Sequence, residues 1–521
     1  MTPRRRCRGA WIPRYLSQAS SGNRDDIAVA ATQPTSAPTV SLHIGLFFDG
    51  TRNNADNLQR ASRPAGATTP APRPPAVIAD DASPYQSRLT SSYSNGLTNI
   101  ARLQALYPDH RQVPPVDDTL ALSIYIAGVG TRTGEEDDLM GLAFGIGRTG
   151  VRAKRRQALE QLLPEALRQL ARAQPGRTLG SVRVDLFGYS RGAASARDAV
   201  NVLNAPAAAA WLREQLVRSG WALAPAFPGT ARPVRFVGLL DTVVAIGRQH
   251  RDEMPAVALR VGCADKVVQL VARDEHREHF ALTSVAPEHE EIALPGVHAN
   301  IGGGYDQRIE GPKLLSRPQG QLLRGNVLAP GAVPPLDLLR ATTVYRNAQA
   351  TCRRWQRALG LGDDAIWVDV WHQWQPQRRV ESRSVLPQPT LRAYAAVVLR
   401  REIDARYQFI ALRLLHQRAA AAGVTWTTSP DALPALALPA ELQPIAARLL
   451  AGTPLDPAQE RLLRQRYLMQ SAHWNFDALG DTALLYATDA GTRELPYRPG
   501  PGLFYINRPT ASGQRVVLAN T

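Results

Sequence analysis

Short apolar runs recur between about residues 40 and 310, and a polar turn follows each of them. Helical stretches lie between the runs; the longest is predicted over residues 151–173, with an irregularity at Pro164. Apolar strands that alternate with helices are typical of a mostly parallel sheet with helices on both faces. The pattern therefore predicts an α/β fold. The predicted strands lie in VSLHIGLFF (40–48), LALSIYIAGVGT (120–131), VRVDLF (182–187) and VRFVGLL (234–240).

The pattern changes beyond Pro318. Helical segments are predicted near 333–360, 391–421 and 440–468, separated by proline-rich turns, with no clear new series of strands. The first 39 residues are rich in Ala, Ser, Pro and Arg and show no periodicity. The sequence thus predicts a flexible leader at 1–39, an α/β domain at 40–315 and a mainly helical region at 316–521.

The chain is strongly basic, with a formal net charge of +16. Such a charge suits nucleic acid or an anionic membrane. The arginines are scattered, however, as a general preference for this residue would produce, and aromatic residues are not interleaved with them. We therefore expect no nucleic-acid partner. Cys7, Cys263 and Cys352 match no metal-binding or disulfide spacing, so we expect neither a metal nor another cofactor.

The start of the sequence, MTPRRRCRGAWIPRYLSQAS, is basic but contains no long apolar run. A signal peptide needs about 7–15 consecutive apolar residues, and a membrane span needs roughly 18–20. The sequence therefore predicts a protein made in the cytoplasm without a signal peptide, whose export would use another route.

Gly188-Tyr189-Ser190-Arg191-Gly192 fits the pattern G-x-S-x-G. An apolar strand precedes the motif and a helix of small residues follows it, which is the context of a nucleophile elbow. In such a turn the serine hydroxyl projects above the sheet, and the N–H of Arg191 can stabilise an oxyanion. The alternative is a serine that only caps a helix.

A nucleophilic serine needs a base and a group that orients the base. In α/β-hydrolases these follow the serine as Asp or Glu and then His. Asp241 ends the strand VRFVGLL, and His298 lies in the glycine-rich loop PGVHANIGGGY, so both are candidates. Asp241 could instead cap the next turn, and His473, in SAHWNF, is a rival base.

The loop Asp49-Gly50-Thr51 follows the first strand, so the N–H group of Gly50 or Thr51 could be the second oxyanion donor. Asp49 is expected to brace this loop or, as an alternative, to bind a cation. Residues 145–150 fit G-x-G-x-x-G, but no convincing strand precedes them. A flap or a helix entry is the better interpretation of that segment than a dinucleotide site.

Five sequence blocks occur together and in order: FFDGTRNN (47–54), FGYSRGAASAR (187–197), FVGLLDTV (236–243), LVARDEHREHF (270–280) and LPGVHANIGGGY (294–305). They resemble the signature blocks of a bacterial α/β-hydrolase family that includes type VI secretion phospholipase effectors. The resemblance covers roughly residues 40–310. It implies a catalytic triad of Ser190, Asp241 and His298, in agreement with the reasoning from the residues.

The same resemblance implies release of fatty acids from glycerophospholipids in the periplasm of competing bacteria, by an enzyme of the phospholipase A1 or A2 type. It further implies delivery by a secretion spike protein and neutralisation by a cognate immunity protein. The region 316–521, with Trp367, Trp371 and Trp374, is a candidate lid or membrane-docking part, or ordinary core. The alternative functions are a soluble carboxylesterase or other acyl hydrolase, and a basic, non-catalytic adaptor on a hydrolase fold.

Overall fold

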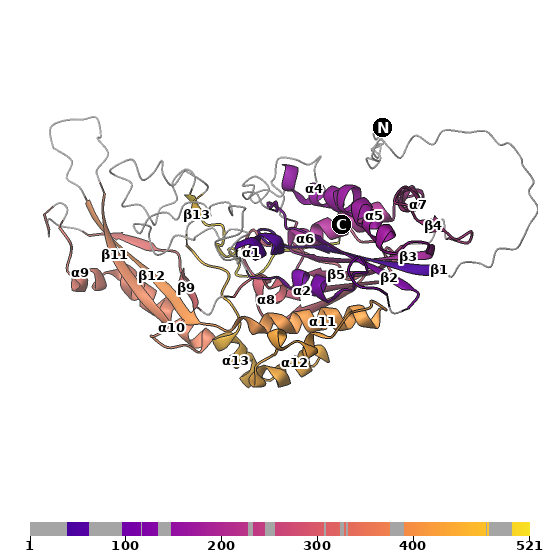
Figure 1. Ribbon diagram of the computed structural model, residues 1–521. Helices are drawn as coiled ribbons and strands as arrows, with labels where there is room; N and C mark the ends of the chain where they lie inside the picture. Colours follow the sequence, from indigo (N-terminus) through magenta and orange to yellow (C-terminus); the bar gives the residue numbers. More distant parts are fainter. Residues whose placement is uncertain are drawn as a thin grey trace, which may run out of the picture.

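The computed structural model contains a large parallel sheet between two layers of helices and a smaller antiparallel sheet at one end (Figure 1). The predicted leader, apart from Thr39, lies outside the described residues. These comprise 39–61, 96–115, 117–133, 147–227, 233–244, 256–306, 309–323, 328–329, 332–375, 390–475, 477–478 and 503–520.

The central sheet has the strand order β2-β1-β3-β5-β6-β8, with β4 paired to β3, and all its pairings are parallel. The strands predicted from the apolar runs are confirmed. Their near-continuous apolar character follows from burial of both faces of the sheet. The strands are β1 (Thr39–Phe48), β2 (Thr119–Ile126), β3 (Thr178–Tyr189), β4 (Ala222–Leu223), β5 (Val234–Leu240), β6 (Lys266–Ala272) and β8 (Glu290–Leu294).

Helices cover both faces of this sheet (Figure 1). Alternate residues of a strand point to opposite faces. On β1, Leu46 packs in the core beneath α4–α7, whereas Phe47 packs with Phe187 in the core beneath α2, α8 and α11. One layer comprises α4 (Val151–Arg156), α5 (Leu163–Ala173), α6 (Arg191–Leu203) and α7 (Ala208–Arg218), and the other α2 (Asn99–Leu106), α8 (His298–Gly302) and α11 (Gln408–Ala421).

The helix predicted over 151–173 is present, and its irregularity has the predicted cause. A π-helical segment, Gln157–Leu162, separates α4 from α5. Pro164 lies two residues after its end, in the first turn of α5. Because proline has no N–H, it cannot donate the α-helical bond to the preceding turn, and the backbone adjusts locally there.

One predicted helix is partly wrong. Residues 390–402 of the segment near 391–421 form a strand, β12 (Thr390–Glu402), and the helix α11 begins only at Gln408. Ten residues of β12 pair with β11 (Ile366–Gln375). An apolar run such as AAVVL suits a buried strand and a buried helix equally well, so periodicity alone could not decide between them.

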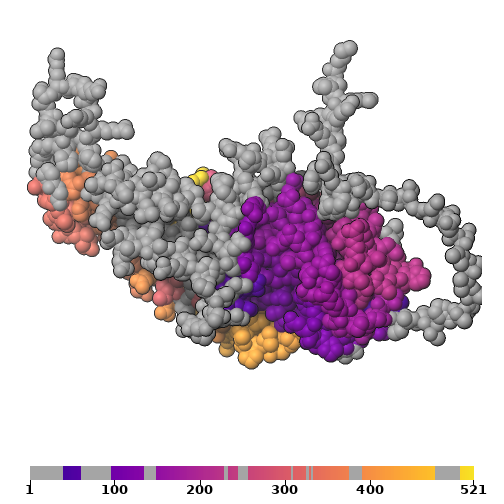
Figure 2. Space-filling model, turned by 45° about the horizontal axis from the view of Figure 1, so that its top comes forward, coloured from indigo at the N-terminus to yellow at the C-terminus, as the bar shows by residue number. Residues whose placement is uncertain are grey.

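β12 belongs to a smaller sheet at one end of an elongated molecule (Figure 2). Trp367 and Trp371 pack against Leu314, Ala396 and Val398 of this sheet. Both tryptophans are only half-buried, so they lie at the edge of this small core. The further elements of this part are β9 (Ile309–Leu314), β10 (Gln319–Leu322), α9 (Leu336–Arg340) and α10 (Thr343–Leu359).

The C-terminal region also completes the α/β core. Leu412 and Leu415 of α11 are fully buried in the same cluster as Phe187 and Phe236 of the central sheet. The amide of Asn99 donates to the carbonyl of Gln408 at 2.9 Å. The domain boundary at residue 315 stays a prediction, but side chains from both sides of it pack in one core.

Residues 505–520 belong to the last described segment and form the C-terminal strap. Its strand β15 (Val517–Leu518) pairs in parallel with β7 (Leu282–Thr283). Among the described residues, no helix is both long and apolar enough to cross a bilayer. The remaining elements are α1 (Ala55–Ala61), α12 (Gln443–Leu450), α13 (Pro457–Arg466), β13 (Asp477–Ala478) and β14 (Leu503–Phe504).

Candidate active site

Ser190 lies in a sharp turn between β3 and α6. Its φ of 57° and ψ of −126° are strained for a residue with a side chain. The two glycines of the motif permit this turn. A Cβ at Gly188 would lie 2.5 Å from Ala193 Cα, and one at Gly192 would lie 2.2 Å from the carbonyl oxygen of Asp49. The strand, the helix and the loop after β1 thus meet around Ser190 at distances that only glycine allows.

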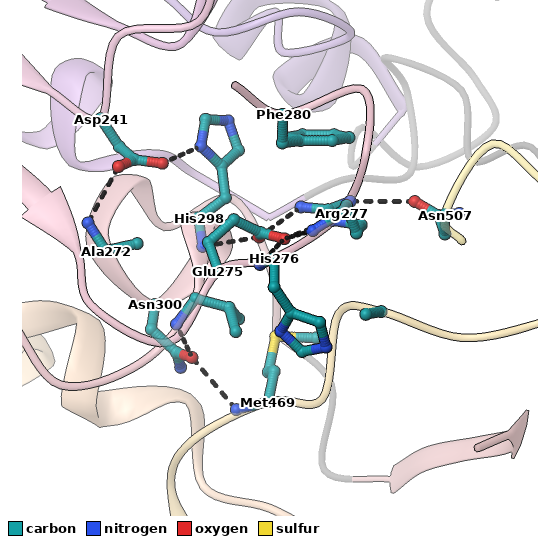
Figure 3. Close-up of polar contacts among 12 residues, drawn as sticks. Asp241, Ala272, Glu275, His276, Arg277, Phe280, His298, Asn300, Met469 and Asn507 are labelled. Carbon is teal, nitrogen blue, oxygen red and sulfur yellow. Dashed lines mark hydrogen bonds and ion pairs between the residues drawn. The ribbon is translucent and has the colours of Figure 1, made fainter. Parts of the chain in front are cut away.

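Asp241 and His298 form a direct contact. The Nδ1 atom of His298 lies 2.5 Å from Oδ2 of Asp241, and both side chains are buried (Figure 3). Asp241 follows β5 with a φ of 47°, and its Oδ1 accepts a hydrogen bond from Ala272 N at 2.8 Å. An ionised carboxylate can only accept, so Nδ1 carries the proton and Nε2 is left as the basic nitrogen.

Contacts through neighbouring residues bring this pair to the serine. The ring of Tyr189 lies under the imidazole of His298, with 4.7 Å between centroids, and the Tyr189 hydroxyl donates to the His298 carbonyl at 3.3 Å. The N–H of Val243 approaches the carbonyl of Ser190 at 3.4 Å. All three predicted residues therefore lie at the carboxyl end of the parallel strands, where open α/β sheets place their sites.

The rival base occupies a different environment. His473 Nδ1 accepts a hydrogen bond from Asn475 N at 3.2 Å, and the backbone N–H of His473 donates to the carbonyl of Asn507 at 2.9 Å. Burial, together with the charges of Lys313 and Arg277, holds the pKa of His473 well below its usual value. Within the described part of the chain His473 has no carboxylate that could orient it, and the contact with Asp241 favours His298.

The electrostatics of the pair suit a neutral base beside a permanent anion. Burial lowers the pKa of His298, and the neighbouring Asp241 partly opposes this shift. Burial alone would raise the pKa of Asp241, but Arg515 and His298 outweigh burial and hold it well below its usual range. At neutral pH the imidazole is therefore free to accept a proton while the carboxylate stays ionised.

A buried carboxylate also supports the backbone of His298. Glu275 Oε2 accepts a hydrogen bond from His298 N at 3.2 Å and one from Arg277 Nη2 at 2.8 Å (Figure 3). Burial alone would raise the pKa of Glu275, but the charge and hydrogen bonds of Arg277 outweigh burial and lower this pKa to about 2. The guanidinium of Arg277 lies 3.3 Å from the centroid of Phe280, whose ring packs edge-on against His298. The block at 270–280 thus forms a support for the histidine.

The loop after β1 is braced by Asp49, as expected. Asp49 accepts hydrogen bonds from Gly50 N and Thr98 Oγ1, both at 2.7 Å, and from the Tyr125 hydroxyl. Burial raises its pKa to about 6. Because the N–H of Gly50 already donates to Asp49, it is a poor candidate for the second oxyanion donor. Thr51 remains, and its buried Oγ1 has no partner within the described residues.

The other expectations concern metals and the glycine-rich segment. Within the residues that the structure describes, no cluster of three or more His, Cys, Asp or Glu side chains could hold a metal ion. Gly150 is the N-cap of α4, so the described part of the 145–150 motif is a helix entry. Residues 145 and 146 lie outside the described part.

Sequence reasoning missed Arg515. It lies 274 positions after Asp241 in the chain, yet its Nη1 and Nη2 donate to the two carboxylate oxygens of Asp241 at 2.6 and 2.8 Å. An arginine near the end of a chain with many arginines carries no signal of such a role. Only the pairing of β15 with β7 brings it to the site.

Comparison with known proteins agrees with the sequence blocks. Residues 214–319, which include Asp241 and His298 but not Ser190, match the family model of the type VI secretion system (T6SS) phospholipase effector Tle1-like catalytic domain. A chain in the structure of the Tle1 effector bound to the VgrG spike from the type 6 secretion system is 24% identical. It matches with a TM-score of 0.66, over 96% of this chain and 98% of that chain.

The resemblance drawn from the sequence is thereby confirmed, and the chain is similar in fold to this structure. An uncharacterized protein from Pseudomonas aeruginosa matches at 19% identity over 51% of this chain and 42% of that chain, but its TM-score of 0.27 carries no argument. No curated protein matches the sequence.

Proposed function

We propose that this chain is a serine phospholipase and an antibacterial effector of a type VI secretion system. The observation that carries the proposal is the buried contact between His298 and Asp241 beside the strained turn of Ser190. The match of residues 214–319 to a T6SS phospholipase effector domain supports the lipid substrate. A non-catalytic adaptor would have no need for a strained serine beside an oriented histidine.

In the proposed reaction Nε2 of His298 takes the proton from Ser190 Oγ as the oxygen attacks the acyl ester carbonyl. Asp241 holds the imidazole in the required tautomer and stabilises the imidazolium. The same histidine then gives the proton to the departing lysophospholipid oxygen. Water, activated in turn by His298, hydrolyses the acyl-serine and releases the fatty acid.

The developing oxyanion would lie between the start of α6 and the loop after β1. The first N–H groups of a helix have no partner in the preceding turn, and the helix dipole favours negative charge there. We assign the donors to Arg191 N–H and Thr51. Gly50 shapes the loop instead, because its N–H donates to Asp49 and a Cβ there would meet Tyr189 at 2.4 Å.

The central test compares Ser190→Ala with Ser195→Ala. Ser195 lies on the same helix, but its hydroxyl donates to the carbonyls of Val151 and Arg191, so it has only a packing role. Each protein is expressed with a periplasmic signal sequence, and fatty-acid release is measured on phosphatidylethanolamine–phosphatidylglycerol vesicles. We expect Ser190→Ala to lose both toxicity and release, and Ser195→Ala to keep both. Equal release by Ser190→Ala and the unaltered protein would defeat the proposal.

The substrate class separates the phospholipase from a soluble esterase. A phospholipase acts faster on vesicles than on short water-soluble esters, whereas an esterase does the reverse. Phospholipids with different chains at the two glycerol positions would show whether the enzyme is of the A1 or A2 type. Faster hydrolysis of p-nitrophenyl butyrate than of vesicles would favour the esterase.

The delivery partner and the site of action are proposed on the same basis. The related Tle1 effector is bound to a VgrG spike, so we propose a spike protein as carrier, the periplasm of target cells as the place of action and a cognate immunity protein as inhibitor. The region 316–521 is proposed as the membrane-docking part. Co-purification with a spike protein encoded nearby, and vesicle binding by Ser190→Ala, would test the carrier and the docking separately.

A further inference from the structure

We infer that the C-terminal strap is a working part of the active site, in which Arg515 is a positioning residue that fixes the carboxylate of Asp241 for His298. The inference rests on the proposed serine chemistry but not on the lipid substrate.

The guanidinium of Arg515 forms a bidentate contact with the carboxylate of Asp241. Nη1 donates to Oδ1 at 2.6 Å, and Nη2 donates to Oδ2 at 2.8 Å. Together with Ala272 N on Oδ1 and His298 Nδ1 on Oδ2, these contacts occupy the acceptor sites of the carboxylate. A two-point contact fixes the plane of the carboxylate as well as its place, which a single hydrogen bond cannot do. The oxygen that faces His298 is therefore held at a set angle.

The arginine is itself held tightly. Its Nε donates to the carbonyl of Phe280 at 2.9 Å, and its side chain is only 7% exposed. Directly after it in the chain, the carbonyl of Val516 accepts a hydrogen bond from Leu282 N, and the strap continues as β15. Farther along, Asn520 Oδ1 accepts from the fully buried Arg197 at 2.7 Å. The strap is thus fastened beyond Arg515 by contacts that do not touch the triad.

The contact has a second consequence, for charge. A cation on the far side of Asp241 keeps the carboxylate ionised, but it also opposes the positive charge that His298 gains on protonation. Removing the cation should raise the pKa of His298. The groups that face the imidazole are Asp241, Glu275, Arg277 and the rings of Tyr189 and Phe280, with Arg515 acting through Asp241.

Two substitutions separate geometry from charge. Arg515→Lys keeps the charge but loses the bidentate contact, and Arg515→Met loses both at similar length. The readout is the rate of covalent labelling of Ser190 by a fluorophosphonate from pH 4 to 9, which needs no lipid. We expect both variants to label about 10–100-fold more slowly, the range typical when a partner that orients a reactive group is lost. Only Arg515→Met should move the acid limb to higher pH, by on the order of one unit.

The matched control is Arg508→Ala, which removes another ion-paired arginine of the same strap. It should label at the unaltered rate and show an unchanged pH profile. As a second readout, methylguanidinium should restore part of the labelling of Arg515→Ala, which a merely loosened fold would not allow. Urea unfolding of every variant shows whether the fold persists.

The outcomes separate the two proposals. Suppose that Arg515→Lys and Arg515→Met label at the unaltered rate and pH profile, while Ser190→Ala does not label. This result would overturn the role of Arg515 and leave the serine chemistry standing. A slowing by Arg508→Ala as large as that by Arg515→Met would reduce the strap to a structural support. If the unaltered protein does not label at Ser190, the proposed function itself fails.

Discussion

Replacement of Gly192 by alanine tests whether close packing at the elbow sets the reactivity of Ser190. A Cβ at this position would lie 2.2 Å from the carbonyl oxygen of Asp49 and 2.4 Å from that of Phe48. Ordinary contacts begin at 3.4 Å, so the helix or the loop must move by about 1.2 Å. Both obstacles are backbone atoms, so no side-chain rotation can relieve the clash.

This movement should cost stability and, more strongly, rate. Overpacking of this kind costs about 1–3 kcal/mol of unfolding free energy. The displaced loop carries Thr51, a proposed oxyanion donor, and a misplacement of about 1 Å can cost on the order of 10²-fold in rate. We expect fluorophosphonate labelling and fatty-acid release of Gly192→Ala to fall together by about that factor, with a modestly lower urea midpoint.

Gly176→Ala is the matched control. Gly176 has a φ of +76°, but nothing lies within 4 Å of its Cβ position. The substitution therefore introduces backbone strain of roughly 1–2 kcal/mol without any clash, and it should lower stability while leaving labelling unchanged. Labelling of Gly192→Ala at the unaltered rate would refute the reasoning that links the elbow to the loop.

Two further predictions concern the buried carboxyl of the loop and the C-terminal helix. The pKa of Asp49 is about 6 in the fold and 3.8 in the unfolded reference, so its stabilising effect is full below pH 3.8 and is lost as pH rises through 6. That loss amounts to about 3 kcal/mol; in urea unfolding, Asp49→Asn should remove this part of the pH dependence, and an unchanged slope between pH 4 and 7 would contradict it. Leu412→Ala should cost about 2–5 kcal/mol, because α11 completes the core under the central sheet. A single unfolding transition at a lower urea midpoint supports this, whereas a separate transition for the C-terminal region, with the catalytic part unaffected, does not.

The sequence by itself determined the α/β core and the candidate triad, because both depend on local signals. A strand buried on both faces is mostly apolar, and a nucleophile elbow must have glycines beside its serine. The strand that ends at Tyr189 and the motif Gly188–Gly192 could therefore be recognised in the sequence. A nucleophilic serine requires a base and a carboxylate that orients it, and the chain order typical of α/β-hydrolases then pointed to Asp241 and His298. Whether these three act as proposed stays a prediction that the labelling experiments address.

Local sequence signals could not predict the structure where the same residues suit two arrangements equally well. The apolar run in 390–402 suits a helix or a strand, and pairing with β11 over ten residues decided for the strand. The N–H of Gly50 looked available for an oxyanion until the fold showed it donating to Asp49. The strand was decided by a partner that lies elsewhere along the chain. The role of Gly50 was decided by the orientation of the Asp49 side chain, which a sequence pattern does not record.

Only the tertiary structure decided what surrounds the triad. Arg515 reaches Asp241 across 274 positions, and Glu275 supports the backbone of His298 from a separate loop. α11 lies under the catalytic sheet although the sequence places it after a change of pattern. The physical reason is common to all three: periodicity and motifs report which face of an element is buried, whereas the partner that buries it is chosen by packing and by the need to pair buried charges.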